Sequence, residues 1–236
     1  MKTIDLIKDM FFPRTCAICG YDASEKYGMA LCDDCGEKYE SLKFEKCAHC
    51  GKISSLCRCE PTFSPAANVS FVHLIKYESD VSKQLIYFIK HKESTALRDF
   101  IASDMAEEAK KYFSGRTAVT YAPRSREAIK RYGFDQAREI AFTVSKKTGA
   151  EFCDMFVHTK NKTEQKTLGA AARSENAEKS YVLSDKANVD YDTLIIVDDV
   201  ITTGSTVGKL VALLREYEIG NIVVLTAAKT PYHVSK

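Results

Sequence analysis

The sequence predicts an α/β protein, in which a doubly wound, mostly parallel sheet follows a small cysteine-rich segment. Short apolar runs alternate with helical patterns between residues 68 and 227, as is typical of a parallel sheet covered by helices. Eight of the nine cysteines fall between Cys16 and Cys59, ahead of the first predicted strand. A chain of 236 residues is long enough for two modest domains, which we place at residues 1–62 and 63–236.

Composition is ordinary for a globular protein, with 45% hydrophobic and 28% charged residues and a net charge of +2. The charge is uneven, because residues 63–170 carry 18 Lys and Arg against 13 Asp and Glu. An anionic partner is expected to dock there, although a solvated face explains the same bias. No run reaches the roughly 18 apolar residues of a membrane helix, so no membrane insertion is expected. Residues 1–12 suit an amphipathic helix better than a secretory signal, so a cytoplasmic location is the default.

The cysteines form four close pairs, and Gly20, Gly36 and Gly51 directly follow three of them. In the cytosol thiols stay reduced, so such clusters indicate metal rather than disulfides. A Cys-x-x-Cys-Gly turn lets two thiolates reach one ion, while glycine takes the positive φ that the turn requires. Eight thiolates suffice for two closed, structural zinc sites, and an interleaved cross-brace is the alternative to sequential pairing. The expected quartets are Cys16, Cys19, Cys32 and Cys35, then Cys47, Cys50, Cys57 and Cys59.

The remaining elements follow from local patterns after the proline-containing linker that ends the cysteine region. Apolar, β-branched runs predict strands, and apolar residues at helical spacing predict helices. Cys153, alone within the third run, is expected to be a buried strand residue. The predicted strands are 68–77, 117–122, 152–157, 181–183, 194–197 and 221–227. The predicted helices are 81–90, 96–113, 134–148, 170–178 and 207–217, with a polar loop at 160–169.

The junction after the strand at 194–197 has the chemistry of a sugar-phosphate site. Asp198 and Asp199 follow the strand, and a loop of small hydroxyl residues with Gly204 leads into a helix. Ligands of open α/β sheets bind at such junctions, and free N–H groups at a helix N-terminus attract phosphate. Two carboxylates suit hydroxyl groups better than phosphate. A nucleotide P-loop is rejected, because Leu210 stands where Ser or Thr must reach Mg²⁺.

Residues 197–204, Val-Asp-Asp-Val-Ile-Thr-Thr-Gly, resemble the phosphoribosyl-pyrophosphate (PRPP) loop of type I phosphoribosyltransferases. The resemblance implies that the acidic pair binds the ribose 2′- and 3′-hydroxyls and that the loop amides bind the 5′-phosphate. It also implies Mg²⁺ bridging pyrophosphate and ribose oxygens. The expected PRPP contacts in this segment are Asp198, Asp199, Val200, Ile201, Thr202, Thr203, Gly204, Ser205 and Thr206.

Two further polar clusters are candidates for the pyrophosphate. Arg124 and Arg126 follow the strand at 117–122, and arginine binds phosphate through two N–H groups at once. A basic surface helix explains this cluster equally well. Gln165 and Arg173 belong to the second cluster, formed by residues 163–166 and 173–176, which could be a mobile loop that closes over the pyrophosphate and excludes water. An ordinary exposed loop is the alternative there.

The order of motifs along nearly the whole chain resembles the ComF family of competence-associated proteins. Cysteine knuckles come first, then Phe88-Ile-Lys-His-Lys92, the segment from Arg131 to Gln136, and the acidic loop. The family's Arg-Gly-Phe-Asn-Gln motif is Arg-Tyr-Gly-Phe-Asp-Gln here, with Tyr132 inserted and Asp135 in place of Asn. The resemblance implies a double zinc ribbon joined to a type I phosphoribosyltransferase domain.

The same resemblance implies a role in handling single-stranded DNA during natural transformation, with other competence proteins as partners. Arg124, Arg126, Lys130 and Arg131 would contact DNA phosphates, and Tyr121, Tyr132 and Phe134 could stack on bases. The alternative is a catalytically active phosphoribosyltransferase of nucleotide metabolism or base salvage. No residue identifies an acceptor or a dedicated general base, so the sequence leaves turnover open.

Overall fold

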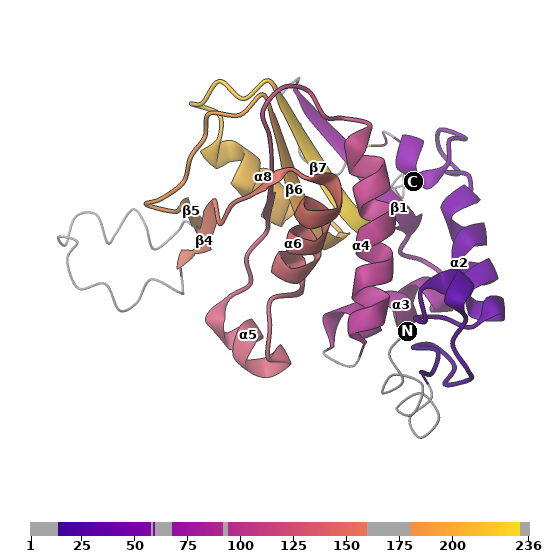
Figure 1. The fold of residues 1–236 in the computed structure, drawn as a ribbon. Coiled ribbons are helices and arrows are strands. Elements are labelled where there is room, and N and C mark those ends of the chain that lie inside the picture. Colours follow the sequence, from indigo (N-terminus) through magenta and orange to yellow (C-terminus); the bar gives the residue numbers. More distant parts are fainter. Residues whose placement is uncertain (1–13, 58, 60–67, 92–93, 160–179, 232–236) are drawn as a thin grey trace.

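A computed structural model describes residues 14–57, 59, 68–91, 94–159 and 180–231. Its centre is a parallel sheet of five strands in the order β1-β7-β6-β2-β3 (Figure 1). The strands are β1 (Val69–Lys76), β2 (Thr117–Tyr121), β3 (Glu151–Phe152), β6 (Thr193–Ile201) and β7 (Asn221–Lys229). The predicted doubly wound α/β fold is therefore confirmed.

Helices cover both faces of the sheet. On one face α3 (Asp80–Lys90), α4 (Thr95–Lys110) and α6 (Gln136–Thr148) pack on apolar side chains such as Val119, Ile195 and Val223. On the other face α8 (Ser205–Leu213) packs on side chains that include Leu194 and Ile196. Residues 194–197 of β6 and 222–225 of β7 alternate between the two cores, because successive side chains of a strand point to opposite faces. The sheet is therefore buried on both sides, as parallel sheets require.

The helix boundaries follow from capping residues in the sequence. Ser79, Ser94, Ser125 and Asp135 each accept a backbone N–H with their side chains at the starts of α3, α4, α5 (Arg126–Tyr132) and α6. Such caps satisfy donors that the first helical turn leaves without a partner. Gly133 and Gly149 end α5 and α6 in the left-handed conformation that glycine adopts most readily.

The cysteine-rich region packs against α4 and β1 and shares one apolar core with them. It contains the helix α2 (Asp33–Phe44) and two short 3-10 helices, η1 (Glu25–Tyr27) and η2 (Ser54–Leu56). The rings of Tyr27 and Tyr39 lie edge-on to Phe100 of α4, with centroids 6.2 and 5.4 Å away. The division at residue 62 stays a prediction, because residues 60–67 lie outside the described residues.

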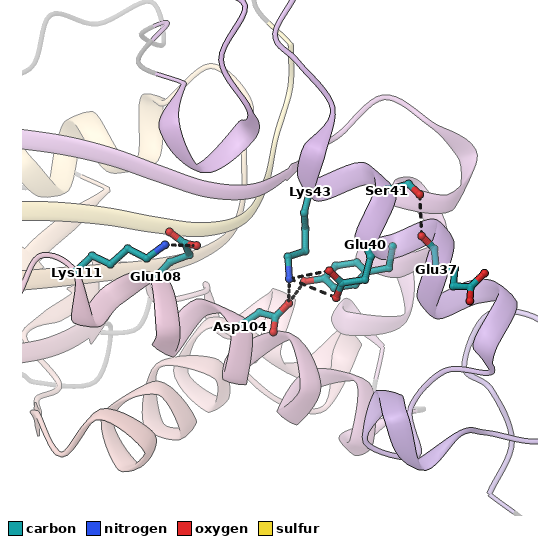
Figure 2. A network of polar contacts seen from close by, with 8 residues as sticks. Glu37, Glu40, Ser41, Lys43, Asp104, Glu108 and Lys111 are labelled. Atoms are coloured by element: carbon teal, nitrogen blue, oxygen red, sulfur yellow. Dashed lines mark hydrogen bonds and ion pairs between the residues drawn. The ribbon is translucent and has the colours of Figure 1, made fainter.

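Polar contacts reinforce this junction between α2 and α4. Asp104 accepts a hydrogen bond from the hydroxyl of buried Tyr39 at 2.8 Å and from Lys43 Nζ at 2.8 Å. Figure 2 shows Lys43 reaching from α2 to Asp104, with Glu40 beside it and a separate pair between Lys111 and Glu108. The junction thus combines aromatic packing with paired charges.

Three expectations about secondary structure are corrected. The run at 152–157 is not one strand, because the chain leaves the sheet after Phe152 and pairs again as β4 (Phe156–His158) with β5 (Tyr181–Leu183). Cys153 lies in the break and is only half-buried. The strand predicted to end at Val197 continues to Ile201, since its partner β7 also continues and pairs with it. The helices predicted at residues 1–12 and 170–178 and the polar loop predicted at 160–169 lie outside the described residues.

Candidate functional site

The chain turns in opposite directions after β2 and after β6, which lie side by side in the sheet. From β2 it passes through α5 and α6 to β3, and from β6 it passes through α8 to β7 on the other side. Such a reversal leaves a crevice at the carboxyl ends of the two strands, where open α/β sheets bind ligands. Arg124 follows β2, and Asp198 and Asp199 lie near the end of β6, so these predicted residues meet at one place.

Asp199 is the most enclosed carboxylate of this crevice, with 5% of its surface exposed. Its Oδ2 lies 3.8 Å from Arg124 Nη2 and 3.8 Å from Lys90 Nζ of α3, and it accepts a hydrogen bond from Gln136 Nε2 of α6. Two helices and the segment after β2 therefore direct nitrogen atoms at one oxygen atom. Groups that hold this carboxylate are also groups that could bind the oxygen atoms of an anionic ligand.

Asp198 has different surroundings. It is half-buried, and its Oδ1 accepts the backbone N–H of Asp199 at 2.8 Å. Burial and the neighbouring Asp199 raise the pKa of Asp198 well above the usual range of an aspartate, against a weaker opposite effect of that N–H and Lys90. A carboxyl of this kind gains from a ligand that brings hydroxyl groups or positive charge. Perturbed carboxyls in a crevice are frequent at functional sites.

The loop after β6 has the form of a phosphate cradle. Thr202 and Thr203 are exposed, and Gly204 has a φ of 73°, which is why glycine suits this position at the start of α8. Thr203 Oγ1 accepts the backbone N–H of Ser205 at 3.3 Å, and Thr206 lies in the first turn. N–H groups in the first turn of a helix have no partner within the helix, so they are available to an anion. Val200 and Ile201 lie within β6 instead of the loop.

Arg124 is held in place by Asp135, whose Oδ2 accepts the backbone N–H of Arg124 at 2.8 Å. The other oxygen of Asp135 accepts the N–H of Arg138 at the start of α6. Burial raises the pKa of Asp135, although these N–H groups and Arg124 act in the opposite direction. The Arg124 guanidinium also lies 4.6 Å from the ring centre of Tyr132. The segment from Arg131 to Gln136 therefore positions side chains of the crevice. Tyr132 and Asp135 contact Arg124, and Gln136 donates to Asp199.

The other residues predicted from the sequence differ in their exposure and in whether the structure describes them. Arg126 is the first residue of α5 and is exposed. Gln165 and Arg173 lie outside the described residues. Tyr121 and Phe134 are 8% and 7% exposed, so neither ring is open to a stacking base, and only Tyr132 of the three is partly accessible.

Lys90 and Gln136 were not among the residues predicted to touch the ligand. Both lie in motifs quoted for the family resemblance, which was the one signal that could have identified them. Tyr181 of β5 was also missed. Burial raises the pKa of Tyr181, and its side-chain hydrogen bond with Thr206 acts against that shift.

The eight cysteines gather in the two sequential quartets and not in an interleaved arrangement. Within each quartet the four Sγ atoms lie within 4.8 Å of one another. The Sγ atoms of Cys19 and Cys32 are 3.5 Å apart, and those of Cys50 and Cys57 are 3.7 Å apart. Four sulfur atoms at zinc–sulfur distances of about 2.3 Å stand about 3.8 Å from one another in a tetrahedron. The donor set and its geometry fit zinc, so both quartets could bind it.

The first pair of each quartet lies on a knuckle of the same form. The N–H of Cys16 bonds Tyr21 O and that of Cys47 bonds Lys52 O, while Gly20 and Gly51 have φ values of 78° and 70°. Although burial opposes the thiolate form, the N–H groups of Cys50 and His49 lower the pKa of Cys47 to about 6. A lowered pKa favours the thiolate that a metal ion requires.

The expectation that Gly36 also has positive φ is wrong. Gly36 lies within α2, because Cys32 and Cys35 are at the N-terminal end of a helix and not on a knuckle. A Cβ at this glycine would come within 2.2 Å of the ring of Tyr27. Glycine is needed here for the close approach of that ring.

No described helix has the length and apolar character needed to cross a membrane. A family model for the phosphoribosyl transferase domain matches residues 116–235. The chain is similar to the competence protein ComFC of Streptococcus pneumoniae (strain ATCC BAA-255 / R6), at 27% identity over 190 residues that cover 79% of this chain and 81% of that protein. It is also similar to a solved structure of the allosteric regulatory enzyme of purine biosynthesis, at 14% identity and a TM-score of 0.35. That similarity covers 55% of this chain but only 25% of the other.

Proposed function

The chain belongs to the phosphoribosyl transferase domain family and is a ComF-like protein with two cysteine quartets, and we propose that it binds PRPP with Mg²⁺ in the crevice between β2 and β6. The observation that carries this proposal is the meeting of the Asp198–Asp199 pair and the Thr202–Gly204 loop with Arg124. Three kinds of group then lie at one edge of the sheet. The carboxylates can accept hydrogen bonds from hydroxyls, the N–H groups can bind a phosphate, and the cations can bind a pyrophosphate.

The roles follow from the chemistry of each group. Asp198 and Asp199 accept the ribose hydroxyls, and the loop with the first turn of α8 holds the 5′-phosphate. Arg124 and Lys90 now lie against Asp199 and turn to the pyrophosphate when it arrives. Mg²⁺, held mainly by oxygen atoms of the ligand, would supply the charge compensation that pyrophosphate needs. Gln165, Arg173 and Arg126 stay predictions as further ligands of the pyrophosphate.

Calorimetric titration of PRPP in the presence of Mg²⁺ tests this assignment. The wild-type protein is expected to bind, and the double variant Asp198→Ala, Asp199→Ala is expected to lose binding while it stays folded. A matched control is Asp185→Ala, which removes an exposed carboxylate elsewhere on the surface. PRPP affinity that is unchanged in the double variant contradicts the assignment.

The cysteine quartets are proposed to hold two structural zinc ions. A closed site of four thiolates leaves no position for a substrate, so zinc here stabilises the fold and takes no part in chemistry. Elemental analysis should give two zinc ions per chain, and a value near one would mean that one quartet is vacant.

For the biological role we propose handling of single-stranded DNA in natural transformation, in the cytoplasm and together with other competence proteins. Support comes from the similarity to a protein named as a competence protein and from the basic residues around α5. Lys130 and Arg131 are exposed in the last turn of α5, whereas Arg124 is directed at Asp199. The exposed pair and Arg126 would therefore contact DNA phosphates, with Tyr132 beside them.

Single-stranded DNA should bind with an affinity that falls steeply with salt, because bound phosphates release counterions. Replacing Lys130 and Arg131 by Ala should weaken DNA binding and flatten its salt dependence without loss of PRPP binding. Wild-type protein that shows no salt-sensitive binding at low ionic strength would exclude direct DNA contact by this chain. A catalytically active phosphoribosyltransferase is the second candidate, and release of pyrophosphate from PRPP in the presence of an acceptor would favour it.

A further inference from the structure

Arg98 of α4 is a buried cation, with 5% of its surface exposed. A buried arginine stays charged, so its guanidinium needs partners. Nε lies 3.2 Å from Glu139 in the first turn of α6, Nη1 donates to the carbonyl of His91 at 3.4 Å, and the ring centre of Phe134 is 4.6 Å away. Nη2 donates to Thr95 of α4 itself at 3.4 Å. One side chain thus joins α4 to the end of α3 and to the start of α6, against which α4 packs (Figure 1).

The hydrogen bond from Arg98 to His91 holds the end of α3. His91 caps this helix, and the last carbonyl groups of a helix have no donor within it, so the guanidinium supplies one. Lys90, the residue before His91, lies 3.8 Å from Asp199 Oδ2 in the crevice. A lysine side chain is flexible, so the range of its ammonium group depends on where its backbone is held. Arg98 therefore limits the position of one crevice cation.

The contact between Arg98 and Phe134 holds the turn between α5 and α6. The Phe134 ring is 7% exposed and lies against the guanidinium, a cation–π contact that is strongest where water is excluded. Phe134 precedes Asp135, whose carboxylate accepts the backbone N–H of Arg124 at 2.8 Å. A displaced Phe134 ring would move Asp135, and the backbone of Arg124 with it. Arg98 therefore also limits the position of the second crevice cation.

The ring of His91 connects the two cations by a further route. It stacks on Tyr87 of α3, with ring centres 4.0 Å apart, and lies edge-on to Tyr132 of α5 at 5.4 Å. Tyr132 in turn lies 4.6 Å from the guanidinium of Arg124. Because α5 has no buried residue, contacts such as these hold it in place. The residue whose carbonyl Arg98 binds is thus in contact with both sides of the crevice mouth.

We propose that Arg98 is a positioning residue for PRPP binding, which holds Lys90 and Arg124 at the spacing that the pyrophosphate requires. This inference rests on the proposed function, in which both cations turn from Asp199 to the pyrophosphate. Arginine suits the role, because its planar guanidinium donates in several directions at once. The ribose and the 5′-phosphate are assigned to β6 and α8, neither of which has a described contact with Arg98. Arg98 should therefore affect the pyrophosphate end of the ligand and not the ribose 5-phosphate end.

Calorimetric titration of the zinc-loaded full chain with PRPP and with ribose 5-phosphate, each with Mg²⁺, tests the proposal. Arg98→Met keeps the length of the side chain and removes its donors, and Glu139 stays solvated because its side chain is 47% exposed. PRPP should bind about tenfold more weakly to this variant, while ribose 5-phosphate stays within about twofold, since residues that act through others change affinity by such amounts. Unchanged PRPP affinity, or an equal loss for both ligands, overturns the proposal.

Arg98→Lys is the conservative variant. Its ammonium group can pair with Glu139, but it lacks the planar fork that reaches His91 at the same time. The melting temperature should match that of the wild type, and PRPP affinity should fall about threefold, between the wild type and Arg98→Met. If Arg98→Met does not fold, the ratio of PRPP to ribose 5-phosphate affinity in Arg98→Lys decides, and a ratio equal to that of the wild type overturns the proposal.

Arg116→Met is the matched control, because Arg116 precedes β2 at the opposite edge of the sheet and its side chain is 48% exposed. It should leave both affinities unchanged. A double-mutant cycle then shows whether Arg98 acts through Lys90. Lys90→Ala should weaken PRPP binding less in the Arg98→Met background than in the wild type, because Lys90 is already misplaced there. Additive losses would overturn the proposal.

Titration with inorganic pyrophosphate and Mg²⁺ separates this inference from the proposed function. A wild-type protein that binds pyrophosphate but not PRPP would refute the PRPP proposal, and weaker pyrophosphate binding by Arg98→Met would still support the role of Arg98. PRPP binding that is equal in the wild type and Arg98→Met would do the reverse. If the wild type binds neither ligand, both proposals are refuted.

Discussion

The carboxylates of Asp104 and Asp198 are both partly shielded from solvent, but their surroundings differ. At the junction of α2 and α4, Asp104 accepts hydrogen bonds from Tyr39 and Lys43, so its charge is fully matched (Figure 2). In the crevice, Asp198 lies next to a second carboxylate, and its pKa is raised. The first place is complete as it stands, whereas the second gains from a ligand. Substitutions at the two places should therefore have opposite effects on the free energy of unfolding.

The largest effect is expected from Tyr39→Ala at the junction. Tyr39 is 0% exposed, packs on Phe100 and bonds Asp104. Loss of a large buried ring should lower the free energy of unfolding by about 3–5 kcal/mol, as measured by urea denaturation of the zinc-loaded protein. Tyr21, which is 77% exposed, supplies the control, since Tyr21→Ala should change stability by less than about 0.5 kcal/mol. Similar losses in both variants would show that the junction is not a core.

Asp104→Ala should come next, with a loss of about 2 kcal/mol. Among the described residues, the variant leaves the buried Tyr39 hydroxyl without its acceptor and leaves Lys43 with Glu40 as its charged partner. PRPP binding, measured by calorimetry, should not change, because the junction lies apart from the crevice. A variant as stable as the wild type would mean that water replaces the carboxylate at no cost.

Asp198→Asn should have the opposite effect on stability, because it should raise the free energy of unfolding by about 1 kcal/mol at pH 7. PRPP binding should be lost in the same variant. Because the folded-state pKa of Asp198 is raised, the folded protein is favoured when the carboxyl is protonated. That stability is full below the unfolded-state pKa of about 3.9 and is lost as pH rises towards the folded-state pKa. The gain from Asn should therefore vanish near pH 4. A gain that is equal at pH 4 and pH 7 would contradict the raised pKa.

The smallest effect is expected from Lys111→Ala, at the second ion pair of Figure 2. Lys111 Nζ is 2.7 Å from Glu108, closer than Lys43 is to Asp104, but the lysine side chain is 61% exposed. Exposed ion pairs contribute little, so stability should change by less than about 0.5 kcal/mol. A loss as large as that of Asp104→Ala would show that pairing distance, and not burial, decides the stability of this surface.

Much of the fold was predictable because it rests on local patterns. The strands at 117–122, 181–183 and 221–227 and the helices at 81–90 and 134–148 were placed within a few residues, since periodicity and capping residues act over short distances. The cysteine spacings likewise predicted the sequential quartets. By contrast, α2 was not predicted, because its residues lie within the cysteine region and its stability comes from packing on α4.

The sequence by itself determined the acidic pair, the hydroxyl-rich loop and the two sets of thiols, because each is a contiguous or closely spaced group. Only the tertiary structure decided which side chains surround them. Lys90 and Gln136 reach Asp199 from 109 and 63 positions away. Such contacts depend on the order of strands in the sheet and on how helices pack against it, which short-range patterns do not encode. The predicted strand at 152–157 is interrupted for the same reason, because Phe156 pairs with Leu183 of β5 and not with a strand of the central sheet.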